Sequence, residues 1–325
     1  MAEHETKNAP IVVCMPAFNE WASLALLIPD LSAALSAAGI SARVLIVDDA
    51  STEPMPPDFL AGLVGPLPVD VLRLRRNLGH QRAIAIGLAY IAEHLPCEAV
   101  VVMDADGEDP PAGAVALVRA FRDDPHADVI FARRRRRVEG PLFRGFYAIY
   151  KAMHRILVGR TIEVGNFSIV PRAHVERLGA VMETWNHYAA SVYHARIPNR
   201  SIPLDRARRL AGHSRMNFVA LVMHGLCAIS VYGDIVAVRL LVSTAALLGL
   251  SLAAAAALVA GHALDQAWAP LWAAAAAGLA AVALLQMLYL AGFASFLVLQ
   301  NRSGTGFLPR RDYVHFVEGC VHVRG

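Results

Sequence analysis

The stretch VVMDADGEDPP, residues 101–111, carries the strongest indication of the fold of this chain. It begins with the apolar, β-branched residues of a buried strand and runs into two aspartates, Asp104 and Asp106. In parallel α/β sheets, ligands bind at the edge formed by the carboxyl ends of the strands. Two carboxylates at that edge suit Mg²⁺ or Mn²⁺ bridging a substrate diphosphate. An isolated Asp-x-Asp also occurs by chance in solvated turns and helix caps, so its surroundings must decide.

The residues around this stretch alternate between short apolar runs and helical patterns. Strands are expected at 11–15, 43–49, 69–74, 99–104 and 128–132, and helices at about 22–38, 81–94 and 113–121. This alternation predicts a mostly parallel sheet flanked by helices. No Gly-x-Gly-x-x-Gly follows a strand, which counts against a dinucleotide-binding oxidoreductase. The absence of Gly-x-x-x-x-Gly-Lys-[Ser/Thr] counts against a P-loop nucleotidase.

Two long apolar stretches lie near the C-terminus of a chain that is 56% hydrophobic. Neither 240–261 nor 267–301 contains a charged residue, and each exceeds the roughly 20 residues that cross a bilayer as a helix. The short polar connector GHALDQ (261–266) between them predicts a transmembrane hairpin. The alternative is a pair of alanine-rich helices buried in a soluble protein.

The charges beside these stretches predict the orientation of the hairpin. Arginines flank its two ends, at 239, 302, 310 and 311, whereas the connector carries only Asp265 and His262. Both ends are therefore expected on the cytoplasmic side. The polar N-terminus shows no secretory signal. We expect a multi-pass protein of the cytoplasmic (inner) membrane with a cytoplasmic catalytic domain.

The remaining composition points to a membrane surface. Residues 133–137 are five consecutive arginines, which fit phosphate-rich lipid head groups beside a hairpin better than nucleic acid, so no nucleic-acid partner is expected. Residues 212–234 are apolar but interrupted by Arg215 and His224. They predict one or two short interface helices or, alternatively, an ordinary buried helix. The four cysteines form no Cys-x-x-Cys pair and are expected to be reduced.

Six motifs follow one another along the chain: PAFNE (16–20), IVDDAS (46–51), RRNLGHQRAIAIGL (75–88), DADGEDPP (104–111), FARRRRR (131–137) with FRGFYAIY (143–150), and the Arg, Gly and Ser pattern of 206–215. In this order they resemble family 2 glycosyltransferases with a GT-A fold, specifically the membrane-anchored polyprenyl-phosphate or dolichyl-phosphate glycosyltransferases. Phe18 stands where the family usually has Tyr. The resemblance spans roughly residues 10–300.

The resemblance implies an α/β architecture: a Rossmann-like GT-A (nucleotide-diphospho-sugar transferase) domain, then interface helices and a two-helix transmembrane hairpin. The expected boundaries are 1–210 for the cytoplasmic GT-A domain, 211–236 for juxtamembrane amphipathic helices, 237–300 for the hairpin and 301–325 for a cytoplasmic tail.

The resemblance also assigns the donor site. The expected nucleotide-binding residues are Pro16, Asn19, Glu20, Asp48, Asp49, Asn77, Gly79, Asp104 and Ser214. Asp49, with Asp48, is expected to accept hydrogen bonds from the base, and Asp106 to hold the metal together with Asp104. Glu108 is a candidate third metal ligand, although many relatives have Gln there. The cation is needed because a nucleoside diphosphate leaves poorly until its developing charge is neutralised.

Four arginines are expected to contact the acceptor or the diphosphate: Arg133, Arg136, Arg206 and Arg209. The planar guanidinium gives bidentate, permanently charged hydrogen bonds to phosphate. Arg134, Arg135 and Arg137 of the 133–137 run are better explained as part of a solvated basic loop.

Asn166, in VGNFSIVPR (164–172), departs from the Gly-Asp-Phe or Gly-Asp-Tyr of relatives. An amide cannot act as a general base for a sugar hydroxyl. A phosphate monoester loses its second proton near pH 6 and needs no base. Asn166 is therefore compatible with a lipid-phosphate acceptor, and it is also compatible with a subfamily that uses another donor sugar. Asp109 and His80 are the fallback candidates for a base.

Taken together, these features predict an inverting glycosyltransferase that uses Mg²⁺ or Mn²⁺. It would move a sugar from a nucleotide-sugar to polyprenyl phosphate at the cytoplasmic membrane face, and a UDP-sugar is the favoured donor. The alternatives are transfer to a hydroxyl of a lipid-linked glycan and a non-catalytic membrane scaffold of a glycan-assembly complex. Alanine-rich faces of the hairpin would also permit a homo-oligomer.

Overall fold

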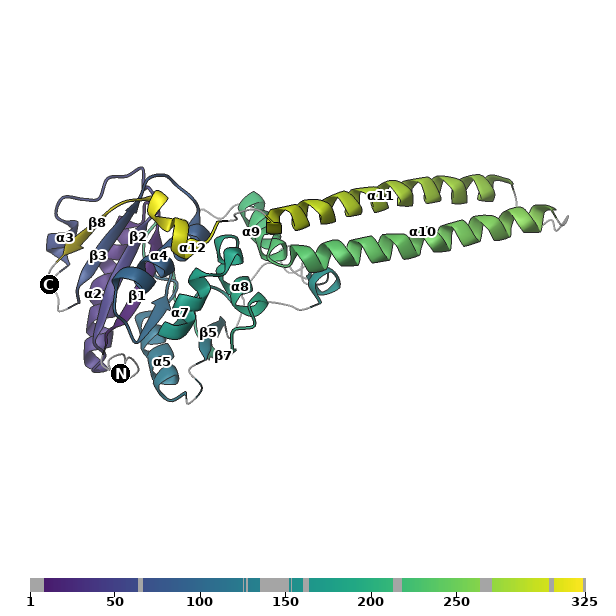
Figure 1. The fold of residues 1–325 in the computed structure, drawn as a ribbon. Coiled ribbons are helices and arrows are strands. Elements are labelled where there is room, and N and C mark those ends of the chain that lie inside the picture. The colour runs from purple at the N-terminus through teal and green to yellow at the C-terminus, as the bar shows by residue number, and fades with distance from the viewer. Residues whose placement is uncertain are drawn as a thin grey trace. The chain divides into compact units, whose positions relative to one another are not determined.

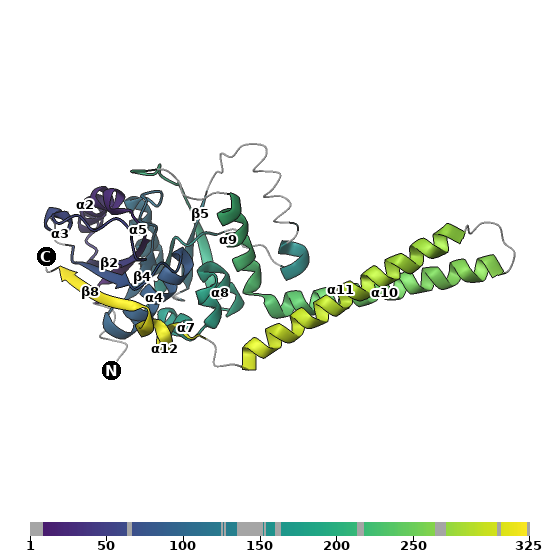
Figure 2. The same cartoon turned by 90° about the horizontal axis from the view of Figure 1, so that it is seen from above.

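The computed structural model describes residues 9–63, 67–124, 126, 128–134, 152, 154–159, 164–212, 218–263, 271–303 and 307–323 (Figures 1 and 2). These residues divide into two compact units. The larger unit contains the described residues up to 134, from 164 to 231 and from 307 onward, and the smaller unit contains the rest.

An eight-stranded mixed sheet with the order β7-β5-β6-β4-β1-β2-β3-β8 forms the centre of the larger unit. The strands are β1 (Ile11–Ala17), β2 (Ala42–Asp48), β3 (Val69–Leu74), β4 (Ala99–Val102), β5 (Val129–Arg134), β6 (Ser168–Pro171), β7 (Asn199–Leu204) and β8 (Val317–Val323). The four strands β4, β1, β2 and β3 run parallel to one another, whereas β6 is antiparallel to β4 and β5. The predicted alternation of strands and helices is therefore observed, with β6 and β8 as antiparallel additions.

Helices cover both faces of this sheet (Figure 1). One face packs against α2 (Trp21–Ala37), α3 (Phe59–Gly62) and α5 (Pro111–Arg122), and the other against α4 (His80–His94), α7 (Arg172–Gly179) and α8 (Tyr188–His194). Within β1, Val13 belongs to the first core and Val12 to the second, because successive side chains of a strand point to opposite faces. Burial on both faces explains why the strands read as continuous apolar runs.

Helix α4 lies directly on the sheet because Gly87 has no side chain. A Cβ atom at this position would lie 2.5 Å from Cys14 Sγ and 2.8 Å from Val47 Cγ2. The close approach fixes α4 against β1 and β2, and thereby fixes the first turn of α4 at the carboxyl edge of the sheet.

The sequence patterns predict a separate tail at 301–325 and do not predict that β8 completes the sheet. In the structure, β8 pairs antiparallel with β3. Asp70 on β3 is buried, and its Oδ1 lies 2.8 Å from His322 Nδ1 of β8. Nearby, Tyr313 Oη lies 2.7 Å from His94 Nε2 at the end of α4. The pattern VEGCVHV is too short and too interrupted by Gly and His to reveal this pairing from the sequence.

The smaller unit contains two long apolar helices, α10 (Gly233–Ala263) and α11 (Leu271–Ser303), which pack side by side (Figures 1 and 2). The segments Gly233–Gly261 and Ala275–Ser295 have mean hydropathies of 2.1 and 1.8. Large apolar side chains are nevertheless exposed, including Leu250 at 68% and Leu279 at 72%. Such exposure is foreign to the core of a soluble domain, and both helices are long enough to cross a bilayer. Residues 261–263 of the predicted connector form the end of α10, and residues 264–266 lie outside the described residues.

Candidate functional site

The three central strands bring the predicted donor-site residues to one edge of the sheet. Because β4, β1 and β2 are parallel neighbours, the loops that follow them lie next to one another. These loops carry Asn19 and Glu20 after β1, Asp48 and Asp49 at the end of β2, and Asp104 and Asp106 after β4. The topology therefore brings these residues to one edge of the sheet, while their roles stay predictions.

Asn19 ties the loop after β1 to the loop after β2. Its backbone N–H donates to Ser51 Oγ (2.8 Å), and its Nδ2 donates to Thr52 Oγ1 (2.8 Å). Its Oδ1 accepts from the N–H of Glu53 (3.0 Å). Asn19 adopts a left-handed backbone with φ of 54°, which asparagine tolerates better than most residues. These contacts hold the two loops together, and direct contact with a nucleotide stays a prediction.

Asp49 holds the loop that leads into α4. Its two carboxylate oxygens accept backbone N–H groups from Leu78 (2.7 Å) and Gly79 (2.8 Å). Burial raises the pKa of Asp49, and these two hydrogen bonds act in the lowering direction. Asp48 makes a similar local contact by accepting the N–H of Ser51 at 3.0 Å. The base-binding role of both aspartates stays a prediction, since the observed contacts are with the backbone.

The Asp-x-Asp loop is braced from within by its own carboxylates. Asp109 Oδ2 accepts the backbone N–H of Asp104 (3.0 Å), and Asp106 Oδ1 accepts that of Glu108 (2.9 Å). Gly107, between Asp106 and Glu108, has φ of 83°, a conformation that only glycine adopts readily. Asp109, one fallback candidate for a base, is thus used to shape this turn.

A segment that follows β7 in the chain, residues 205–212, lies against this loop. The N–H of Ala207 donates to the carbonyl of Glu108 (2.9 Å), and the N–H of Leu210 donates to that of Asp106 (3.0 Å). These two backbone hydrogen bonds bring the predicted arginines of the segment to the predicted metal ligands.

Arg209 and Arg206 both contact carboxylates of the site. Arg209 Nη1 lies 3.0 Å from Asp106 Oδ2, and the same guanidinium pairs with Glu20. Arg206 pairs with Glu108. Burial, and then the neighbouring Asp104, raise the pKa of Asp106, whereas Arg209 acts to lower it. The arrangement offers permanent positive charge directly beside the carboxylate pair, which is what a bound diphosphate requires.

The carboxylates suit a cation whose remaining ligands come from the bound substrate and water. Across the described part of the chain, no three His, Cys, Asp or Glu side chains gather into a metal cage. Mg²⁺ is commonly held by only one or two carboxylates together with substrate phosphates and water. Asp104 and Asp106 can supply that pair, while the carboxylate of Glu108, the candidate third ligand, faces Arg206.

A chain of polar contacts connects Asp104 to Asn166. His80 Nε2 lies 3.1 Å from Asp104 Oδ1 and 3.1 Å from Asn166 Nδ2. Asn166 Oδ1 accepts from Gln81 Nε2 (3.2 Å), and Gln81 Oε1 accepts the N–H of Tyr188 (2.7 Å). Burial lowers the pKa of His80, but Asp104 and its neighbouring carboxylates outweigh this effect and raise it. The residue in place of the usual Asp is thus surrounded by an amide and an imidazole.

Gln81 and Tyr188 are not among the site residues predicted from the sequence. The available signal for Gln81 was its place on the first turn of a helix that starts at the ligand-binding edge. For Tyr188 the sequence offered none, because its contact with Gln81 joins residues 107 positions apart.

Other predicted residues do not join this cluster in the described structure. Pro16 is buried within β1, Asn77 is exposed, and Arg133 is exposed near the end of β5. Gly79 precedes α4 with φ of 92° and contributes its backbone. Arg136 and Ser214 lie outside the described residues.

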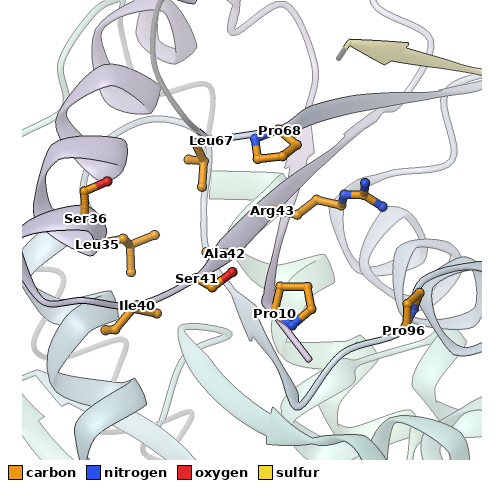
Figure 3. A pocket seen from close by; sticks show the side chains of 10 residues that line it. All are labelled: Pro10, Leu35, Ser36, Ile40, Ser41, Ala42, Arg43, Leu67, Pro68 and Pro96. Carbon is orange, nitrogen blue, oxygen red and sulfur yellow. The ribbon is translucent and has the colours of Figure 1, made fainter. Parts of the chain in front are cut away.

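A cavity of about 450 Å³ lies at the opposite edge of the sheet (Figure 3). It is lined by residues that precede or begin the parallel strands, among them Pro10, Ala42 and Pro68. The amino ends of parallel strands lie away from the carboxylates, so this cavity is separate from the candidate site.

The model of the family described as "Glycosyl transferase family 2" matches residues 12–179, just over half of the chain. These residues include the carboxyl-edge loops after β1, β2 and β4, as well as Asn166.

Curated relatives are similar over part of their length. "Uncharacterized glycosyltransferase YkcC" of Bacillus subtilis (strain 168) is 26% identical over 170 residues, which cover 50% of each protein. "Undecaprenyl-phosphate 4-deoxy-4-formamido-L-arabinose transferase" of Salmonella paratyphi A is 25% identical over 219 residues, which cover 65% of this chain and 64% of the relative. The chain thus spans between half and just under two thirds of these relatives.

A solved structure supports the fold. Glucosyl-3-phosphoglycerate synthase from Mycobacterium tuberculosis, in complex with Mn²⁺, UDP and phosphoglyceric acid, superposes with a TM-score of 0.51. The match covers 71% of this chain and 79% of that one, at 16% sequence identity. The predicted GT-A fold is confirmed by this likeness, which at such identity concerns the fold alone.

Proposed function

The chain belongs to glycosyltransferase family 2, and on that basis we propose that it transfers a sugar from a nucleotide-sugar to a polyprenyl phosphate at the cytoplasmic face of a membrane. The observation that carries the proposal is the carboxylate pair Asp104 and Asp106 at the carboxyl edge of the sheet, with Arg209 bound to Asp106. This edge combines the opposite charges needed for a metal-bound diphosphate.

The proposed donor is a UDP-sugar bound with Mg²⁺ or Mn²⁺. When bound, the cation neutralises charge that develops on the leaving diphosphate. Asp104 and Asp106 would hold it, and Asp49 keeps the backbone of Leu78 and Gly79 in place beside the nucleotide. Arg209 and Arg206 would bind phosphate oxygens as their carboxylate partners turn to the cation.

The surroundings of Asn166 support a phosphate acceptor. Its side chain contacts only neutral or basic groups among the hydrogen bonds described for it, those of Gln81 and His80. A sugar hydroxyl would need a base at this point to remove its proton. The lipid phosphate is already an oxyanion at neutral pH, so the acceptor needs orientation rather than deprotonation.

The proposed reaction is a single displacement. An oxygen of the lipid phosphate forms a bond to the anomeric carbon while the bond from that carbon to the diphosphate oxygen breaks. The diphosphate leaves with the electron pair, and no proton moves. Attack from the side opposite the leaving group inverts the anomeric configuration.

A membrane location is supported by two features of different kinds. Helices α10 and α11 expose apolar side chains over lengths that suit a bilayer. The Salmonella relative is named as an undecaprenyl-phosphate transferase. In this proposal, residues 1–210 form the catalytic domain, 211–236 the interface helices and 237–300 the hairpin.

Transfer to a hydroxyl of a lipid-linked glycan is the second candidate function. It is favoured by one observation: His80 Nε2 lies 3.1 Å from Asp104 Oδ1, so a carboxylate orients an imidazole as in many general bases. In that case His80 would remove the hydroxyl proton.

The test is transfer of labelled sugar from a panel of UDP- and GDP-sugars to undecaprenyl phosphate by the purified full chain with Mn²⁺. We compare the wild type with Asp106→Asn and with a matched control, Asp58→Asn, whose side chain is exposed and is not among the predicted site residues. Metal-dependent transfer that the control retains and Asp106→Asn loses supports the proposal. Transfer only to a glycan-linked acceptor would favour the hydroxyl reaction.

A further inference from the structure

Helix α9 (Phe218–Ser230) has two different faces. Large apolar side chains at helical spacing are exposed on one of them: Val219 at 67%, Val222 at 43%, Met223 at 53% and Leu226 at 48%. His224 and Ala228 lie roughly opposite this stripe on a helical projection, and Ala228 is buried. Such a helix suits the boundary between lipid head groups and acyl chains.

The position of α9 in the chain supports this placement. It ends at Ser230, and the long apolar helix α10 begins at Gly233. If α10 crosses a bilayer, α9 lies within a few residues of the head groups. A lipid phosphate, which sits at the level of the head groups, would therefore come close to α9.

The ring of His224 packs against His187, with ring centroids 4.7 Å apart. His187 precedes α8, and its Nδ1 accepts the backbone N–H of Ala190 at 3.2 Å. A nitrogen that accepts a hydrogen bond carries no proton, so the ring proton of His187 is on Nε2. His187 is thus fixed in one tautomer and one orientation, and it gives His224 a rigid surface.

This histidine pair adjoins the polar chain of the candidate site. Tyr188 follows His187 directly, and its N–H binds Gln81, which binds Asn166. Burial, and then the nearby His80, lower the pKa of His224, while Asp104 acts in the opposite direction. The imidazole of His224, which is neutral near pH 7, is therefore close enough to His80 and Asp104 for their charges to act on it. No hydrogen bond between this ring and another described residue is found.

Building on the proposed function, we propose that His224 is a binding residue for the acceptor and donates a ring N–H to the phosphate of the lipid. An uncharged donor suits this task because it orients the attacking oxyanion without cancelling its charge. Two cationic groups of the described site, Arg206 and Arg209, pair with carboxylates on the donor side and are proposed to bind the diphosphate. Helix α9 would thereby position the phosphate from the membrane side.

The test separates the hydrogen bond from the packing of the ring. His224→Phe keeps a ring against His187 but has no N–H, whereas His224→Asn loses the ring and keeps an N–H donor. We measure KM for undecaprenyl phosphate and KM for the nucleotide-sugar with the full chain. The variant Met223→Ala, which changes the apolar face of α9 but keeps His224, is measured in the same way for comparison. An unchanged KM for the nucleotide-sugar shows that a variant is folded.

A hydrogen bond to a charged phosphate predicts that His224→Phe raises KM for undecaprenyl phosphate about tenfold or more, with KM for the nucleotide-sugar unchanged. His224→Asn should stay within about threefold of the wild type, because its amide replaces the donor. His224→Met, also without a donor, takes the place of the phenylalanine variant if that variant does not fold.

The opposite pattern, a normal His224→Phe and an impaired His224→Asn, would assign His224 to packing and overturn the inference. Equal KM values for the lipid in all variants would do the same. If the wild type transfers sugar only to another acceptor, the proposed function itself fails, and that result is distinct from any variant effect.

Discussion

The contact between Gly107 and Leu210 provides a direct test of how the Asp-x-Asp loop is assembled. A Cβ atom on Gly107 would lie 2.4 Å from Leu210 Cγ. An alanine at this position would also have to adopt φ of 83°. Gly107→Ala should therefore push the 205–212 segment, with Arg206 and Arg209, away from Asp106.

Two separable costs make up the effect. An alanine in the left-handed region costs about 1 to 2 kcal/mol, and overpacking against Leu210 costs about 1 to 3 kcal/mol. Their sum, about 2 to 5 kcal/mol, corresponds to a loss of about 30-fold or more in kcat/KM if the closed arrangement is required for transfer. Leu210→Ala removes only the steric part, so the double variant should recover about 5-fold or more relative to Gly107→Ala.

The assay is kcat/KM for sugar transfer by the wild type, both single variants and the double variant, with thermal unfolding recorded in the same detergent. Recovery in the double variant at unchanged unfolding temperature would localise the effect to this contact. Strictly additive losses, with no recovery from Leu210→Ala, would refute the claim that the segment closes on the loop through these two residues.

Three further predictions concern the scaffold and the site. Asp49→Asn replaces one acceptor with a donor opposite a buried N–H, and we expect the free energy of unfolding to fall by about 1.5 to 3 kcal/mol; an unchanged denaturation curve would argue against this support. Removing residues 317–323 exposes β3 as an edge strand, so we expect soluble aggregates in size-exclusion chromatography, and a monodisperse profile like that of the wild type would contradict it. Tyr313→Phe loses the contact with His94 and should lower the free energy of unfolding by about 0.5 to 1.5 kcal/mol; no change would show that this hydroxyl is equally well solvated when unpaired.

The central sheet and the carboxylate edge could be predicted because their signals are local. Strand β1 is buried on both faces and therefore appears in the sequence as an uninterrupted apolar run. Asp104 and Asp106 follow such a run directly, so their place at the carboxyl edge follows from the strand alone. Membership of glycosyltransferase family 2, predicted from six motifs in order, is confirmed by the family match.

Contacts between distant segments could not be predicted in this way. Strand β8 joins β3 through residues such as His322 and Asp70, which are 252 positions apart. Similarly, the sequence singled out Asn166 as a departure from the residues of relatives but did not reveal that Gln81 binds its amide. Such pairings depend on the packing of α4 and α8 against the sheet, and single-sequence periodicity contains no information about it.

The most direct measurement is the structure of the lipid product, isolated after transfer from a UDP-sugar of known anomeric configuration. The account predicts a sugar joined to polyprenyl phosphate through a phosphodiester at the anomeric carbon, seen by ³¹P NMR and mass spectrometry, with the configuration inverted. A glycosidic bond to a sugar hydroxyl, or retention at the anomeric carbon, would contradict it.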